Sequence, residues 1–175
     1  MRSLTILILT ALAVSVPASA QTIRPESRAI ARDAAAAAVA ACERLGFRIM
    51  ATVVDNAGRP LAARTADPQL AQPLAPDSVH AAQIAAYFHD RSSRIPGRLM
   101  DEPLVDYAVH DNPQLAPLKP GGVPFPGPET LVSIGVAGKS NSENLGAIGV
   151  AGAPDGDKDE ECGLDGVMAV LQELR

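Results

Sequence analysis

The segment IGVAGKSNSENLGAIGVAG, residues 134–152, contains the pentapeptide IGVAG at both ends. Each copy belongs to a short apolar run, and the polar residues KSNSEN lie between the two runs. Two apolar runs joined by a short polar connection are typical of a β-hairpin. We therefore predict antiparallel strands over residues 131–137 and 145–151, lying side by side in one sheet.

The middle of this segment, Gly138-Lys139-Ser140, also resembles the end of a phosphate-binding loop. Such a loop has the pattern G-x-x-x-x-G-K-[ST] and leads into a helix whose first turn contacts the phosphates. Here Ser133 occupies the first glycine position, and the residues after Ser140 lead into the second predicted strand. The sequence therefore favours a hairpin over a nucleotide site.

The repeated segment is rich in glycine, which leaves little side-chain volume on one side of the predicted strands. A helix with small side chains could pack closely there, and the alanine-rich residues 34–41 would supply one. Close approach of a flat ligand is the alternative. The glycines concerned are Gly135, Gly138, Gly146, Gly149 and Gly152.

Periodicity and turn residues predict the remaining elements. A hairpin is expected with strands at 49–54 and 61–64. Proline-rich residues 67–76 and 110–129 are expected to form loops. Asp77 or Ser78 would cap the second helix. The predicted helices cover residues 25–45, 77–91 and 158–174, with a weaker one between 95 and 109.

The N-terminal residues and the charge bear on localisation. Residues 1–20 combine Arg2, an apolar run and a final Ala-Ser-Ala, which is the pattern of a secretory signal peptide. The run is too short for a good membrane span, although an uncleaved anchor is the alternative. We expect a mature domain of residues 21–175, periplasmic or secreted and without a membrane anchor. The net charge of −5, with no basic cluster, argues against binding to nucleic acid or anionic membranes.

Two cysteines, Cys42 and Cys162, would be available for a disulfide in an oxidising compartment. On the last predicted helix, Cys162 lies almost opposite the apolar stripe of a helical wheel. This geometry argues against the pairing, but an error of one or two residues in the helix start would permit it. The stripe consists of Leu164, Val167, Leu171 and Leu174.

Taken in order, several motifs resemble those of the GlcG/HbpS family of haem-binding-type proteins. The alanine-rich helix is followed by VVDNAGRPLA at residues 53–62, and then by Arg64 and Asp67. No single motif is specific, but the ordered set covers nearly the whole predicted mature chain. The later motifs are AAYF at 85–88, GGVPF at 121–125, LGAIGVAGAP at 145–154 and DEECGLDGV at 159–167.

The resemblance implies a single domain of the α/β (α+β) class, in which a mainly antiparallel sheet is covered by helices, similar in shape to PAS and profilin folds. It also implies homo-oligomers. Some members bind haem, haem degradation has been proposed for the family, and many members have no assigned function. Relatives commonly carry Lys-Ala-x-Thr-Ala on the second helix, where residues 81–85 of this chain are AAQIA. Any role of that amine or hydroxyl is absent or has moved here, and His80 would replace it only in part.

If the chain binds haem, the iron requires an axial ligand such as histidine. Covalent attachment is not expected, because the sequence has no C-x-x-C-H motif. His80 is the leading axial ligand, since it shares a predicted helix face with Ile84, Tyr87 and Arg91. Tyr87 would line the ligand, and the Arg91 guanidinium would bind a propionate.

His110 is the second candidate ligand, and the loop at Gly121 and Gly122 would lie close to the ligand or to a neighbouring subunit. Because the sequence has no tryptophan and few other aromatic residues, a ligand would sit in a surface groove or between subunits. The alternative is that His80 is an ordinary surface residue and that Arg91 pairs with a neighbouring acid.

Other chemistry is less well supported by the sequence. No serine lies in a G-x-S-x-G motif. The acidic residues 155–161 suit the start of a helix better than a calcium loop, because the closing glutamate of that loop is missing. The sequence thus favours an exported haem- or tetrapyrrole-binding accessory protein. The alternatives are a cofactor-free oligomeric structural or interaction module and, less favoured, a haem-degrading enzyme.

Overall fold

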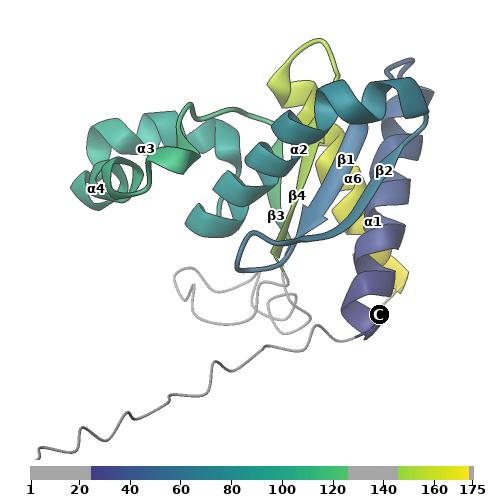
Figure 1. The fold of residues 1–175 in the computed structure, drawn as a ribbon, viewed down its shortest axis with the longest axis horizontal. Helices are drawn as coiled ribbons and strands as arrows, with labels where there is room; N and C mark the ends of the chain where they lie inside the picture. Colours follow the sequence, from purple (N-terminus) through teal and green to yellow (C-terminus); the bar gives the residue numbers. More distant parts are fainter. Residues whose placement is uncertain (1–24, 126–145, 174–175) are drawn as a thin grey trace, which may run out of the picture.

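A four-stranded antiparallel sheet forms the centre of the protein (Figure 1). We describe residues 25–125 and 146–173 of a computed structural model. The strand order is β2-β1-β4-β3. The strands are β1 (Met50–Val54), β2 (Pro60–Thr65), β3 (Gly122–Phe125) and β4 (Gly146–Ala151).

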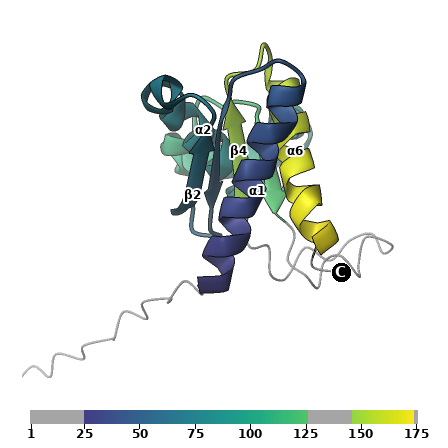
Figure 2. The same cartoon turned by 90° about the vertical axis from the view of Figure 1, so that its right-hand side faces the viewer.

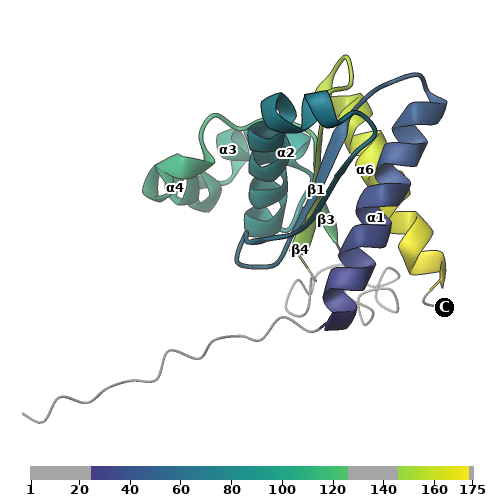
Figure 3. The ribbon, with the colours of Figure 1, turned by 45° about the vertical axis from the view of Figure 1, so that its right-hand side comes forward.

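Helices cover both faces of this sheet (Figures 2 and 3). Helices α1 (Pro25–Arg44) and α6 (Gly156–Glu173) lie side by side on one face, and α2 (Pro68–Phe88) covers the other. This arrangement confirms the predicted fold class. The predicted helices at 25–45 and 158–174 and the hairpin at 49–64 are also confirmed, each within about two residues at its ends.

Strand β1 is buried on both faces because it lies in the middle of these layers. Its side chains alternate, as strand geometry requires. Ala51 and Val53 belong to the main core beneath α1 and α6, whereas Val54 packs with alanines of α2. Thr52 also faces α2, where its hydroxyl is 2.8 Å from the Ser78 hydroxyl.

Close packing of helix α2, and not of α1 as predicted, explains Gly149 and Gly122, whereas a Cβ on Gly146 would meet the Val54 carbonyl of β1. A Cβ atom built on Gly149 would lie 2.0 Å from the Ser78 carbonyl oxygen, and one on Gly122 would lie 2.1 Å from that of Ala81. Alanines of α1 belong to the main core on the other face of the sheet, and Ala38 also lies close to α6, where a Cβ on Gly166 would be 2.7 Å from its own.

Helix α2 begins nine residues earlier than predicted: residues 68–76 are helical, although they contain three prolines. Asp67, and not Asp77 or Ser78, is the N-cap, and its carboxylate accepts a hydrogen bond from the Gln69 amide. Pro68 occupies the first turn, where a missing N–H has no consequence. The helix ends at Phe88, because His89 has φ 52°.

The pairing of β4 differs from the predicted hairpin. The first predicted strand, 131–137, lies outside the described residues. Strand β4 pairs with β1 along one edge and with β3 along the other, so both of its edges are occupied. Strand β3 itself lies within residues 110–129, which were expected to form a loop only; Pro124 is tolerated because β3 is an edge strand.

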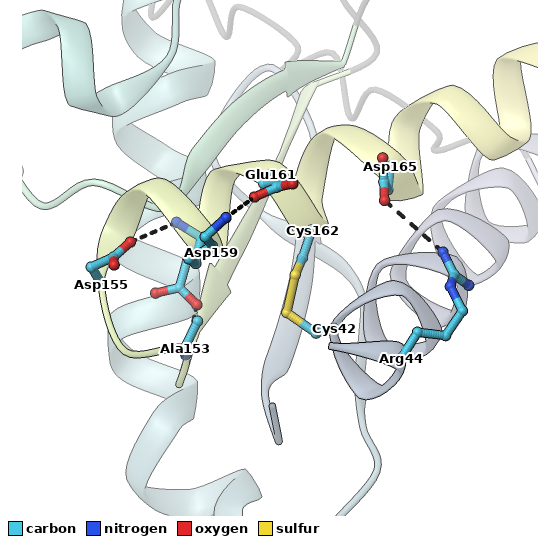
Figure 4. The surroundings of a disulfide bond; sticks show 9 residues. Cys42, Arg44, Ala153, Asp155, Asp159, Glu161, Cys162 and Asp165 are labelled. Carbon is cyan, nitrogen blue, oxygen red and sulfur yellow. Dashed lines mark hydrogen bonds and ion pairs between the residues drawn. A yellow bond between two sulfur atoms is a disulfide. The ribbon is translucent and has the colours of Figure 1, made fainter. Parts of the chain in front are cut away.

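A disulfide joins α1 to α6 through Cys42 and Cys162, whose Cα atoms are 5.5 Å apart (Figure 4). The geometric argument against this pairing was wrong, because it took the apolar stripe of α6 from large side chains alone. Glycines widen the buried face: Gly163 faces the sheet and Gly166 faces α1. Cys162 therefore lies on the buried side and is fully buried.

Two short helices, α3 (Ile95–Asp101) and α4 (Pro103–Asp111), extend away from the sheet beyond α2 (Figure 1). They correspond to the weaker helical region predicted between 95 and 109. Their main contacts are with each other and with two 3-10 turns, η1 (Ser92–Arg94) and η2 (Pro113–Leu115). No helix among the described residues is long and apolar enough to cross a membrane.

Candidate functional site

The outward side of α2 carries a polar stripe formed by His80, Gln83 and Tyr87. Their spacing of three and four residues places them on one side of the helix. Each makes a hydrogen bond to a different segment. His80 Nε2 is 2.8 Å from the Pro117 carbonyl oxygen, and Gln83 Nε2 donates to the Gly58 carbonyl oxygen at 3.0 Å. The Tyr87 hydroxyl accepts from the Asn112 side-chain amide at 2.9 Å.

A cavity of about 270 Å³ lies between α2, the β1–β2 turn and η2. Ala86 and Leu115 form its buried floor, and exposed residues form its rim. Sequence reasoning missed this cavity apart from Tyr87, because its other polar residues come from segments that meet only in the folded chain. Those residues are Asn56, Gln83 and Gln114.

The hydrogen bond of His80 determines which ring nitrogen carries the proton. A carbonyl oxygen only accepts hydrogen bonds, so Nε2 donates to Pro117. In a neutral imidazole, Nδ1 then carries the lone pair. Metal-binding histidines are commonly oriented in this way, by donation from the other ring nitrogen to a backbone carbonyl.

The other predicted ligand-binding residues do not converge around His80. Ile84, which was expected on the ligand side, is fully buried with Ile95 and Leu115. Arg91 does not share the helix face, because α2 ends at Phe88 and Arg91 has an extended backbone before η1. None of the described residues forms a salt bridge with Arg91. His110 is exposed near the end of α4.

Tyr87 is close to its predicted position, with 45% of the residue exposed. It lies seven residues from His80, which is about 10 Å along the helix axis. Its ring packs edge-on against Phe88. Tyr87 therefore lines the small cavity and is too far along α2 to share a metal ion with His80.

Gly121 and Gly122 lie against protein and not beside an open site. Gly121 has φ 110°, and Gly122 begins β3 directly behind α2. A Cβ atom on Gly121 would lie 2.5 Å from the Val150 carbonyl oxygen. Both positions therefore require glycine for backbone packing, a reason that the sequence alone did not distinguish from ligand contact.

A buried carboxylate at the start of α6 was also missed from the sequence. Glu160, only 4% exposed, accepts hydrogen bonds from the Ser93 amide and hydroxyl, each at 2.8 Å. The Ser92 hydroxyl donates to the same carboxylate and accepts from the Gly122 amide. This network joins α6, η1 and β3, and every polar atom within it has a partner.

The neighbouring Asp159 is buried with fewer partners. Its carboxylate accepts a hydrogen bond from the Ala153 amide at 2.9 Å (Figure 4). Burial raises the pKa of Asp159 to about 6, which the Ala153 bond only partly offsets. In the described parts of the chain, no three or more His, Cys, Asp or Glu side chains cluster so as to hold a metal ion.

Comparison with known proteins places this fold and sequence in a family. The profile of the family described as "Haem degrading protein HbpS-like" matches residues 27–168. The chain belongs to the HbpS-like family. This confirms the resemblance inferred from the ordered motifs. No curated protein matches the sequence closely enough to count as a relative.

Several solved structures have the same fold. A double mutant of HbpS from Streptomyces reticuli is 25% identical, with a TM-score of 0.60; the alignment covers 93% of this chain and 98% of that one. Protein ORFY of Klebsiella pneumoniae is 19% identical, with a TM-score of 0.62 and coverage of 92% and 100%. A PduOC:heme complex is 12% identical, with a TM-score of 0.59 and coverage of 84% and 94%.

Proposed function

We propose that this HbpS-like protein binds haem or a related tetrapyrrole, with His80 as the axial ligand. The observation that carries the proposal is the orientation of the His80 imidazole. Its Nε2 atom donates to the Pro117 carbonyl, which leaves Nδ1 with a lone pair on a half-buried ring. Haem would supply an iron centre for redox or ligand-sensing chemistry.

The described residues include a nitrogen donor suited to haem iron, on His80. They do not form a pocket that could enclose the haem. The cavity beside α2, at about 270 Å³, is too small for a macrocycle. Ile84 is covered by the chain's own residues. Haem would therefore lie at the surface beside His80, within the second half of α2, with one side in solvent or against a second copy.

The remaining predicted residues take secondary roles in this proposal. The Arg91 guanidinium, which has no salt-bridge partner among the described residues, remains available to a propionate. Tyr87 would contact the edge of a macrocycle without binding its iron. His110 is the alternative axial ligand, since it is exposed on α4.

We also propose that the protein acts after export, in the periplasm or outside the cell, as a homo-oligomer. The disulfide between Cys42 and Cys162 supports an oxidising compartment, because such bonds are rare in the cytosol. The proposed signal peptide, residues 1–20, lies outside the described residues. N-terminal sequencing of the exported protein would test cleavage after Ala20.

A second candidate function is a cofactor-free oligomeric interaction module. This function is favoured because the chain's own residues cover the side of α2 where a ligand was expected. Ile84 is buried with Ile95 and Leu115, and His80 already has a backbone hydrogen-bond partner. A haem-degrading activity is a third alternative, in keeping with the family description. Haem degradation would be demonstrated if the absorbance of the bound haem disappeared on addition of a reductant and iron was released.

A haemin titration followed by absorbance tests the proposal. The purified protein should give a saturable Soret band, and His80→Ala should weaken binding at least about tenfold, as loss of a ligand bond implies. His89→Asn is the matched control: it removes the imidazole at the C-cap of α2, nine residues from His80, and asparagine tolerates the left-handed backbone there. No Soret band, with normal folding and oligomerisation, would instead support the cofactor-free module.

A further inference from the structure

The small cavity beside α2 has a composition that points to a particular class of ligand. Three side-chain amides and one phenol line it, together with Ala57, Ala86 and Leu115. None of its lining residues is charged. Sites with apolar walls and a few placed polar groups are the usual form of small-molecule pockets.

Internal hydrogen bonds determine which polar atoms remain available to a ligand. Gln83 uses its amide nitrogen on the Gly58 carbonyl, and Gln114 uses its nitrogen on the Asn112 side chain at 3.2 Å. Each amide nitrogen carries a second N–H, so both glutamines keep one donor as well as an amide oxygen that can accept. The Tyr87 oxygen accepts from Asn112, so its hydroxyl hydrogen is available for donation.

This set of atoms selects against charged ligands. No lysine or arginine lines the cavity to balance the charge of an anion, and no carboxylate lines it to balance that of a cation. The charged residues nearest in sequence, Asp55 and Arg59, already bind each other at 2.8 Å. A neutral molecule with several O–H groups satisfies both amide oxygens and also accepts from the tyrosine.

The volume limits the size of the ligand. A cavity of about 270 Å³ has room for a single small ring but not for a macrocycle. The Tyr87 ring and Leu115 provide apolar surface against which a ring with C–H groups can pack.

The rim of the cavity is held in shape without a ligand. The Asp55 carboxylate accepts hydrogen bonds from the Ala57 and Arg59 amides, each at 2.9 Å, and so fixes the β1–β2 turn. Gly58 has φ 73°, and its carbonyl is held by Gln83. A preformed site loses less conformational entropy on binding than a mobile one.

We propose that this cavity binds a small, uncharged, hydroxylated ring, such as a monosaccharide or cyclic polyol. His80, one helical turn before Gln83, does not line the cavity, so the two proposed sites share only Tyr87. The inference does not depend on haem binding.

Nuclear magnetic resonance titration with D-glucose and myo-inositol tests this proposal. Both should give saturable shifts confined to the amides of residues 56–58, 83–87 and 114–115. D-Glucuronate and D-glucosamine, which add a charge to the same ring, should bind at least about fivefold more weakly, in line with the cost of an uncompensated charge.

Two substitutions complete the experiment. Gln114→Leu removes one free acceptor from an exposed position and should weaken glucose binding about fivefold, the usual effect of one hydrogen bond. Gln72→Leu, an exposed position on α2 outside the cavity, should have no effect. The proposal is overturned if no probe saturates, if the charged analogues bind equally well, or if Gln114→Leu binds like the control. His80→Ala should bind glucose normally, so that this test and the haem test fail independently.

Discussion

The disulfide between Cys42 and Cys162 should provide a large part of the stability of this domain. The two cysteines are 120 residues apart in sequence. In the chain-entropy description of cross-links, closing a loop of this length stabilises the folded state by about 5 kcal/mol. Many single domains have a total stability of only about 5–15 kcal/mol. Loss of the bond should therefore lower the melting temperature by about 10–20 °C.

Urea unfolding followed by circular dichroism would measure this effect. The wild type is compared with the double variant Cys42→Ala/Cys162→Ala, and with the wild type unfolded in a reductant. The reductant should leave the double variant unchanged, which controls for its other effects. A difference below about 1 kcal/mol, far under the value from loop closure, would refute the reasoning, as would two titratable thiols in the oxidised protein.

Three further substitutions test the packing and the buried carboxylates. Gly149→Ala should destabilise the fold by about 3 kcal/mol, because its Cβ would meet the backbone of α2; Gly97→Ala, which meets nothing within 4 Å, should be neutral or slightly stabilising in thermal unfolding. Asp159→Asn should stabilise the protein above pH 6 and not near pH 4. In the wild type the pKa of Asp159 is raised from 3.8 to about 6. Its contribution to the free energy of unfolding is therefore fully present below about pH 4 and is lost as the pH rises through about 6. The stability lost over this range is about 3 kcal/mol. A pH-independent difference between Asp159→Asn and the wild type would contradict this assignment. Glu160→Gln should lower the free energy of unfolding in urea by about 1–3 kcal/mol, because an amide cannot accept all the hydrogen bonds of the carboxylate. An unchanged urea midpoint would show that this hydrogen-bond network contributes nothing to stability.

Helix and strand patterns predicted most of the fold. Local periodicity and turn residues were enough to predict α1, the β1–β2 hairpin and α6. Gly46 and Gly58 are two such turn residues, with φ of 86° and 73°. These signals are local, so they can be read without knowing the tertiary contacts. The fold class came from the ordered family motifs.

The errors arose where tertiary contacts override local propensity. Residues 68–76 are helical despite their prolines: Asp67 caps the helix, and Leu74 packs against Gly152. Strand β3 contains Pro124, which the sequence indicated as loop. The packing partners, Gly152 for the early part of α2 and β4 for β3, are distant in sequence.

The candidate site was predictable only in part. His80 and Tyr87 were found because a single helix carries both. Asn56, Gln83 and Gln114 come from three segments, and nothing in their local sequence indicates that they line one cavity. Arg91 was misplaced because a helical wheel was continued past the end of α2 at Phe88.

The most direct test of the proposed haem ligand is electron–nuclear double resonance on the ferric haem-loaded protein, prepared with isotope-labelled histidine. We predict hyperfine coupling from one imidazole nitrogen to the iron. That coupling should persist in His89→Asn and disappear in His80→Ala. Coupling that survives in His80→Ala, or that is absent from the haem-loaded wild type, would contradict the assignment of His80 as the axial ligand.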